Sequence, residues 1–131
     1  MSVTIDWMDS RYTVIHANFI DHWDWGELQK ALAKAHHLMT KSSHSVTLML
    51  DFVGSIKATK TDSLTMLEAA PAPPNLVRLV IISDDPRLAQ KMEDVLHQFY
   101  PHAEDIQSAR SHEEAFSLVR QTLEIAAVKI D

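Results

Sequence analysis

The sequence predicts a single α/β domain with a mostly parallel sheet, and three observations support that class. Short apolar runs typical of buried strands alternate along the chain with longer amphipathic segments typical of helices. Alternating strands and helices need crossover connections, which place successive strands parallel to one another. The first two strand-like runs are instead joined by a short turn, so the N-terminal strand should lie antiparallel at an edge of the sheet. The expected order is β-β-α-β-α-β-α-β-α.

The composition indicates one folded domain spanning residues 1–131. Hydrophobic residues make up 46% of the chain and charged residues 23%, proportions typical of a globular domain rather than a disordered one. A net charge of −6, without a cluster of Lys and Arg, argues against a nucleic-acid partner. No apolar run reaches the roughly 20 residues of a membrane span, and the first residues do not resemble a signal peptide. We therefore expect a cytoplasmic protein.

The first two strands and the first helix can be placed from local patterns. Residues 3–7 and 12–19 are typical of strands and are separated by a turn. Asp24 is the expected N-cap of the helix, because Glu27 follows three residues later and completes a capping box. An apolar stripe at helical spacing should face the core. Its members are Leu28, Ala31, Leu32, Ala35, Leu38 and Met39.

The stretch from Val46 to Phe52 is the expected central strand. It is almost continuously apolar, as suits a strand covered on both faces, and it ends in a carboxylate, Asp51. Alternation places Thr47, Met49 and Asp51 on the same face of the strand. Because two of these three side chains are polar, we expect that face of the sheet to be less completely covered.

Three more helices and two more strands are expected in the rest of the chain. A helix over residues 62–70 should end at the prolines that follow, because proline breaks a helix. Residues 76–82 are typical of a strand, and Asp85 followed by a proline should start the next helix. Residues 106–109 are a candidate edge strand. Ser111, with a glutamate three residues later, should open the last helix.

Two short motifs lie within this predicted order of elements. The apolar strand that starts at Val46 ends in Asp51 and Phe52, and the second helix opens with the pair Asp62-Ser63. Together with the order of elements, these motifs resemble the STAS domain, the family named for sulfate transporters and anti-sigma-factor antagonists. The resemblance covers the whole chain as topology. It implies a non-enzymatic regulatory module that binds a partner protein.

The resemblance also implies a site and a partner. In the antagonists, a partner kinase that also sequesters a sigma factor phosphorylates the serine of the Asp-Ser pair. By this resemblance, Ser63 is the expected phosphorylation site, and a kinase or sigma-regulatory protein is the expected partner. Asp51, Lys57, Lys60 and Asp62 complete the candidate site, since both lysines could hold an anion against the start of the helix. The alternative is an ordinary solvated loop that ends in a helix cap.

Trp23 and Trp25 flank the start of the first helix and suggest a second interpretation. They could line an apolar pocket for a small ligand or lipid, as some STAS-like relatives bind such molecules, or anchor an interface. The alternative is core packing with a hydrophobic staple across the helix cap. The sequence leaves open whether two copies of the chain form a homodimer.

A magnesium site is a third hypothesis, because acidic residues follow two strands that should be neighbours. Asp51 ends one strand, and Asp84 and Asp85 follow the next, at the edge where parallel sheets usually bind ligands. The simpler interpretation is that Asp85 caps its helix and Asp84 is solvated.

Other cofactor and catalytic patterns are missing from the sequence. The eight histidines include no His-x-x-x-His or His-x-His pair that would direct two imidazoles at one metal ion. The chain has no cysteine and only two glycines, and it lacks a Gly-x-Ser-x-Gly nucleophile motif. We therefore expect neither a bound metal or other cofactor nor an enzymatic activity.

Overall fold

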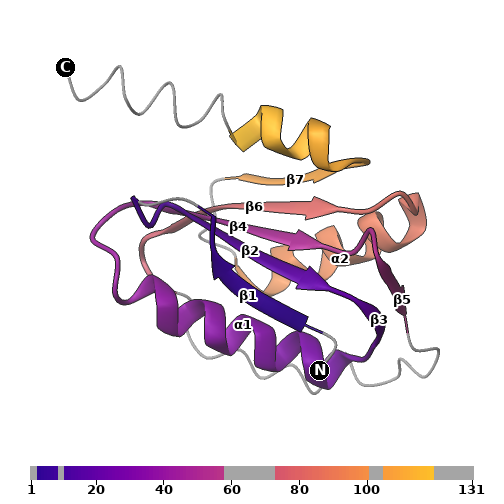
Figure 1. Cartoon of the computed structure of the whole chain (residues 1–131), viewed down its shortest axis with the longest axis horizontal. Helices are drawn as coiled ribbons and strands as arrows, with labels where there is room; N and C mark the ends of the chain where they lie inside the picture. The colour runs from indigo at the N-terminus through magenta and orange to yellow at the C-terminus, as the bar shows by residue number, and fades with distance from the viewer. Residues whose placement is uncertain (1–2, 9–10, 58–72, 101–104, 120–131) are drawn as a thin grey trace.

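The computed structural model describes residues 3–8, 11–57, 73–100 and 105–119, and its centre is a five-stranded sheet (Figure 1). The strands, in their order across the sheet, are β1 (Val3–Trp7), β2 (Val14–Phe19), β4 (Val46–Asp51), β6 (Leu76–Ile82) and β7 (Asp105–Ala109). β1 pairs antiparallel with β2, and every other neighbouring pair is parallel. The predicted α/β class, the mostly parallel sheet and the antiparallel N-terminal edge strand are therefore confirmed.

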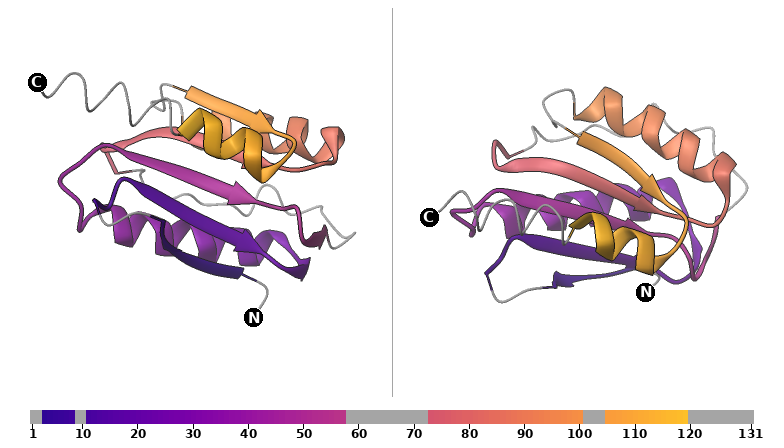
Figure 2. Two further views of the ribbon diagram at one scale, coloured as in Figure 1. Left: turned by 45° about the horizontal axis from the view of Figure 1, so that its top comes forward. Right: turned by 90° about the horizontal axis from the view of Figure 1, so that it is seen from above.

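The two long helices lie on the same face of this sheet (Figure 2). α1 (Trp25–Met39) connects β2 to β4, and α2 (Pro86–Phe99) connects β6 to β7. Both crossovers step across the sheet in the same direction, so right-handed connections place both helices on one side. β4 lies at the centre of the sheet, and all six of its residues are buried, as its apolar sequence predicts.

The face of the sheet that α1 and α2 cover carries the main hydrophobic core. α1 begins as predicted, because the Asp24 side chain accepts a hydrogen bond from the Glu27 backbone N–H at 2.8 Å. The predicted apolar stripe of α1 packs into the core, and Met92 and Leu96 of α2 join it. The strands contribute alternate residues to the same core, as expected from the period of a strand. They include Ile15, Ala17, Phe19, Leu48, Leu50, Leu79 and Ile81.

The opposite face of the sheet is less completely covered among the described residues. Residues 112–119 are helical and pack Ala115 and Val119 over β6, β7 and the centre of β4. On the β1–β2 half of this face, in contrast, Asp6 is exposed and His16 and Asn18 are half-buried. The prediction that the face carrying Asp51 is less covered agrees with this arrangement.

The starts of the two C-terminal helices also follow the sequence. Asp85 accepts a hydrogen bond from the Arg87 N–H at 3.0 Å, with proline as the first residue of α2. Ser111 Oγ accepts from the Glu114 N–H at 3.2 Å, and the Glu114 carboxylate accepts from the Arg110 N–H. The predicted helix over residues 62–70 lies outside the described residues.

A two-stranded parallel pair, β3 (Asp21–Trp23) with β5 (Ser55–Lys57), continues beyond the ends of β2 and β4. The segment after Phe52 was expected to be a loop, so β5 corrects that expectation, and no strand was expected over residues 21–23. Three residues are too few to show strand alternation, so no sequence pattern indicates this pair. Asp21 adopts a left-handed φ of 58°, which turns the chain between β2 and β3.

Candidate functional site

Asp51 accepts hydrogen bonds from two histidines at the carboxyl end of the central strand. His16 Nε2 lies 2.8 Å from Asp51 Oδ2, and His112 Nε2 lies 2.5 Å from the same oxygen. The second carboxylate oxygen, Oδ1, accepts from the Val53 backbone N–H at 3.1 Å. These three side chains, His16, Asp51 and His112, form the histidine–carboxylate cluster. Three elements supply them: β2, β4 and the first turn of the helix that begins at residue 112.

The pairing of the strands explains how His16 reaches the carboxylate. In the β2–β4 register, His16 lies opposite Met49 and Asn18 lies opposite Asp51. Residues two apart on a strand point to the same face, so His16 and Asp51 are diagonal neighbours on one face of the sheet. His112 approaches from above that face, where its helix packs against β6 and β7.

Burial and hydrogen bonding shift the pKa of the Asp51 carboxyl in opposite directions. Burial raises its pKa, because only 2% of the residue is exposed. The hydrogen bonds from His16, Val53 and His112, together with the charge on His112, outweigh burial and place the pKa below its usual value. Asp51 is therefore ionised at neutral pH.

The ionised carboxylate determines which nitrogen of each histidine carries a proton. A carboxylate can only accept hydrogen bonds, so both imidazoles must present an Nε2–H to Asp51. In a neutral ring this leaves Nδ1 with a free lone pair. The two rings therefore direct their donors at the carboxylate and keep their acceptor or nucleophilic atoms on the opposite edge.

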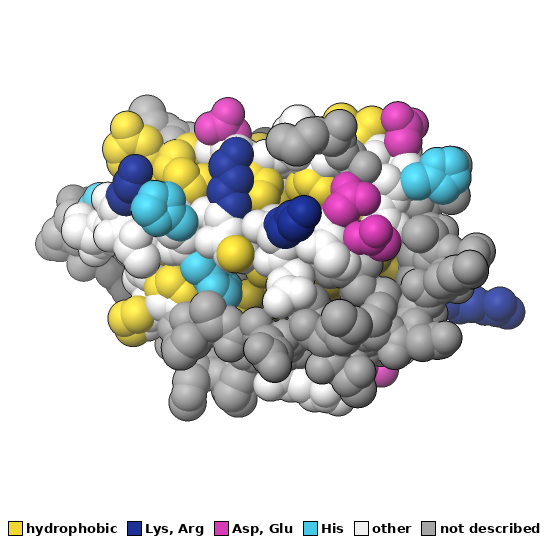
Figure 3. All heavy atoms as spheres, turned by 90° about the horizontal axis from the view of Figure 1, so that it is seen from below, with side chains coloured by type: hydrophobic (Ala, Val, Ile, Leu, Met, Phe, Trp, Pro, Cys, Tyr) yellow, Lys and Arg dark blue, Asp and Glu magenta, His cyan; other side chains and the backbone are white. Residues whose placement is uncertain are grey.

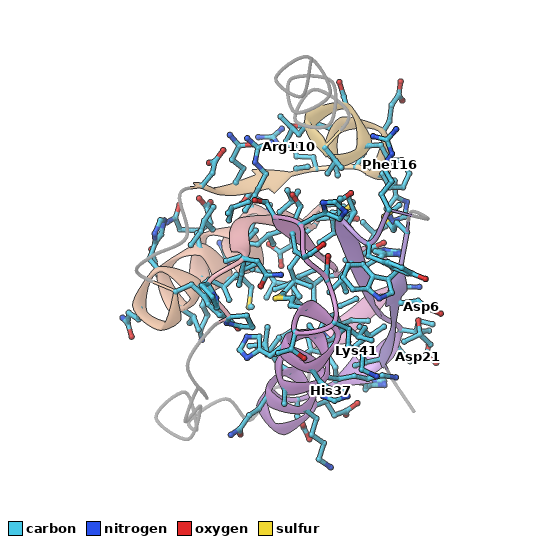
Figure 4. The ribbon with its side chains drawn as sticks, turned by 90° about the vertical axis from the view of Figure 1, so that its left-hand side faces the viewer. Asp6, Asp21, His37, Lys41, Arg110 and Phe116 are labelled. Carbon is cyan, nitrogen blue, oxygen red and sulfur yellow. The ribbon has the colours of Figure 1, made fainter. Side chains whose placement is uncertain are left out.

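His112 is the more accessible of the two histidines. Its side chain is 48% exposed, compared with 26% for His16 and 2% for Asp51. The ring also stacks on Phe116, with 6.1 Å between the ring centroids and an interplanar angle of 16°. Figure 4 shows Phe116 and Asp6 on the same side of the sheet, opposite α2. The carboxylate and Phe116 together set the orientation of the His112 ring.

The structure does not group the acidic residues proposed for magnesium. The Asp85 side chain caps the N-terminus of α2, and Asp84 is exposed. Among the described residues, the hydrogen-bond partners of Asp51 are the two histidines and Val53. Across the part of the chain that the structure describes, no group of three His, Asp or Glu side chains is arranged to hold a metal ion.

The other predicted site residues fall into two groups. Trp23 is buried in the core, where its ring centroid lies 5.4 Å from that of Phe19 and 5.0 Å from that of Phe52. Trp25 is the first residue of α1, but its side chain is outside the described part of the structure. The same holds for the side chain of Lys57, the last residue of β5, whereas Lys60, Asp62 and Ser63 lie wholly outside the described residues.

Sequence reasoning missed both histidines of the cluster. His16 is one of two polar residues, with Asn18, in the otherwise apolar strand from Val14 to Phe19, a signal that could have marked it. His112 is separated from Asp51 by 61 positions, and no local pattern indicates that they meet. The contact depends on how the last helix packs on the sheet.

A second buried polar pair joins α1 to the end of α2. His36 Nε2 lies 2.6 Å from the Tyr100 hydroxyl, and both residues are buried. Burial lowers the pKa of His36 and raises that of Tyr100, so both remain neutral at neutral pH. The Nδ1 atom of His36 is also buried and has no hydrogen-bond partner among the described residues. This pair is a structural contact within the core.

Two exposed apolar side chains lie at the carboxyl edge of the sheet. Ile20 is 40% exposed after β2, and Val53 is 36% exposed after β4. A hydrogen bond from the Asp21 N–H to the Gly54 carbonyl, at 3.1 Å, ties the two segments together. Elsewhere, on the side of β1 and α1, basic, acidic, histidine and hydrophobic side chains are mixed on the surface (Figure 3).

Comparisons of the chain with models of known families, with curated proteins and with solved structures found no match. Among the described helices, none is long and apolar enough to cross a membrane.

Proposed function

We propose that this chain is a STAS-like module that binds a partner protein at the carboxyl edge of β2 and β4. The arrangement of the sheet supports this proposal most strongly. An antiparallel edge strand is followed by parallel strands in chain order, both long helices cover one face, and the central strand ends in Asp51 and Phe52. Those features agree with the fold that the Asp51-Phe52 and Asp62-Ser63 motifs led us to expect.

The carboxyl edge has the mixed chemistry of a protein-binding surface. Ile20 and Val53 expose apolar side chains there, and the same edge carries Asp51 with its two partly exposed histidine partners. Beneath them Phe19 and Phe52 stack with 4.5 Å between ring centroids, which gives the edge a rigid base. Apolar contacts surrounded by polar groups are typical of interfaces between proteins.

The proposed partner is a kinase or a sigma-regulatory protein that recognises this edge and the segment around Ser63. Ser63 follows Val53 and β5 in the sequence, and its own placement lies outside the described residues. Phosphorylation of Ser63 would add up to about two negative charges and change which partner surface can dock. The module is proposed to act by binding and not by catalysis, and a cytoplasmic location is part of the same proposal.

Protein binding is preferred to the alternative of a small apolar ligand. Trp23, one of the two residues proposed to line a pocket, packs its ring against Phe19 and Phe52 and is 1% exposed. A buried aromatic cluster of this kind is explained by the core alone.

Site-specific photocrosslinking tests the proposed binding surface. A photoreactive amino acid at position 20 or 53, introduced in cells of the natural host, should crosslink a partner protein of defined mass. The same probe at Lys34, which is exposed on α1, is the matched control and should not. Equal crosslinking at all three positions, or none at positions 20 and 53, would contradict the proposal. Crosslinks only to a second copy would identify the edge as a homodimer interface instead.

Phosphorylation of Ser63 is tested separately. Mass spectrometry of protein from the natural host should detect a phosphoryl group on Ser63. The Ser63→Asp variant should lose the crosslinked partner, whereas Ser63→Ala should keep it. Identical crosslinking by both variants, with unmodified Ser63 in the host, would remove the switch but leave the binding surface in place.

A further inference from the structure

We propose that His112 is a phosphoryl acceptor, whose Nδ1 takes a phosphoryl group from a phosphohistidine or other phosphoramidate donor while Asp51 holds the opposite ring nitrogen. The observation behind this proposal is the geometry of the histidine–carboxylate cluster. The inference goes beyond the proposed partner binding, which requires no covalent change at this histidine. It is also independent of Ser63.

Two contacts hold the His112 ring while one of its edges is left accessible. Asp51 accepts from Nε2 at 2.5 Å, and Phe116 stacks on the face of the ring. The side chain is nevertheless 48% exposed. Since Nε2 is engaged by the carboxylate, the accessible nucleophilic atom is Nδ1. A fixed ring reduces the orientational freedom that must be lost before an in-line reaction.

The buried carboxylate also makes the free nitrogen a better nucleophile. A carboxylate that accepts the N–H of an imidazole raises the basicity of the opposite nitrogen. It also stabilises the positive charge that the ring acquires when Nδ1 forms a new bond. Asp51 suits this role because it is ionised, 2% exposed and held in place by the Val53 N–H. Histidine is one of the residues that form covalent intermediates in enzymes.

The position of His112 on its helix favours the product. His112 is the first residue of the helical stretch 112–119, where the helix dipole presents its positive end. A phosphoryl group on Nδ1 would be an anion close to that end, the place where phosphate is commonly stabilised in proteins. Arg110, two residues earlier, is exposed and adds a positive charge nearby.

His16 is assigned a positioning role. Its side chain is 26% exposed, about half as much as that of His112. It also lies opposite Asp6 in the β1–β2 register, so a phosphoryl group on His16 would be near a second carboxylate. The bond from His16 Nε2 to Asp51 Oδ2 instead helps to keep the carboxylate ionised and oriented toward His112.

The phosphoryl transfer needs only the donor, His112 and a proton from solvent. The Nδ1 lone pair of His112 attacks phosphorus and forms an N–P bond, while the N–P bond of the donor breaks. The leaving nitrogen of the donor keeps the bonding electron pair and takes a proton from solvent. Nε2–H remains hydrogen-bonded to Asp51, and neither oxidation nor reduction occurs.

Potassium phosphoramidate is the probe that tests this inference. The purified chain should gain the mass of one phosphoryl group, and peptide mapping under neutral conditions should locate it on His112. The label should be lost in acid and retained in alkali, as expected of a phosphoramidate and opposite to phosphoserine. Labelling of the exposed His37 at the same rate, or no labelling of His112, would overturn the proposal.

Three variants separate reactivity from folding. His112→Gln retains an N–H donor toward Asp51 but has no nucleophilic nitrogen, so it should fold like the wild type and lose the label. Asp51→Asn should slow labelling of His112 by roughly tenfold or more, an effect of the size seen when the carboxylate that orients a metal-binding histidine is removed. His37→Gln, on the exposed side of α1, should label like the wild type. If Asp51→Asn keeps its fold by circular dichroism and labels His112 at the wild-type rate, Asp51 does not activate His112.

Discussion

His112 Nε2 lies 2.5 Å from Asp51 Oδ2, although 61 positions separate the two residues in the chain. This contact fastens the first turn of the last helix to the end of the central strand. It also gives a buried carboxylate two imidazole partners on the less covered face of the sheet. Four predictions follow from this contact and from the neighbouring core.

Asp51→Asn should destabilise the fold by about 1.5–3 kcal/mol, the usual contribution of hydrogen bonds to a charged group. The variant removes the charge that His16, His112 and the Val53 N–H share. Urea denaturation followed by tryptophan fluorescence would measure the change. Asp84→Asn is the matched control, because Asp84 is exposed, and should change stability by less than about 0.5 kcal/mol. Equal effects of the two variants would contradict the importance of the cluster.

Acid should weaken the fold through the same carboxyl group. The pKa of Asp51 is lower in the folded protein than its usual value of 3.8, so near that pH the unfolded state binds more protons than the folded state. Its contribution to stability is therefore present above the usual value and is lost as pH falls through the folded value. Urea midpoints between about pH 6 and pH 3 should fall less steeply for Asp51→Asn than for the wild type. An unchanged slope would show that Asp51 does not contribute.

His36 should add a separate pH dependence at higher pH. Burial lowers its pKa below the usual 6.5, so between the folded value and 6.5 the unfolded state binds more protons. The free energy of unfolding should therefore decrease as pH falls below about 6.5. His36→Phe should flatten this part of the curve. The adjacent exposed residue provides the control, because His37→Gln should leave the slope as it is.

Phe52→Ala should be the most damaging single change at the carboxyl edge. Phe52 is 2% exposed, stacks on Phe19 and packs at a tilt against Trp23, so its loss should cost about 3–5 kcal/mol. The next residue offers a direct comparison, because Val53 is 36% exposed and Val53→Ala should cost less than about 0.5 kcal/mol. Thermal and urea unfolding of both variants would test the difference. Similar losses would mean that Phe52 is not part of a tightly packed cluster.

Much of the fold could be predicted because its signals are local. The capping boxes at Asp24 and Ser111 and the Asp85-proline start of α2 are each encoded within a few residues, and the structure contains all three caps. The apolar run that begins at Val46 likewise predicted a central strand that is buried along its length. The short pair β3–β5 was missed because three-residue strands carry no periodic pattern.

The candidate site could be predicted only in part. Asp51 stood out in the sequence because it ends an apolar strand, at the edge where parallel sheets usually bind ligands, and the structure places it at the carboxyl edge of the sheet. Lys60, Asp62 and Ser63, which were expected to share a candidate site with Asp51, lie outside the described part of the chain. Its observed partners were not foreseen, since a histidine on a strand or at a helix start has many ordinary explanations.

The sequence by itself determined the α/β class, the positions of most described strands and helices, and the place of Asp51 at the end of the central strand. Periodicity and helix caps act over a few residues, so they can be recognised without knowing how the chain folds. Only the tertiary structure decided that His16 and His112 share that carboxylate. The β2–β4 register brings in one histidine from 35 positions away, and the packing of the last helix brings in the other from 61. Both contacts form only when the whole sheet is assembled, and no local pattern in the sequence indicates them.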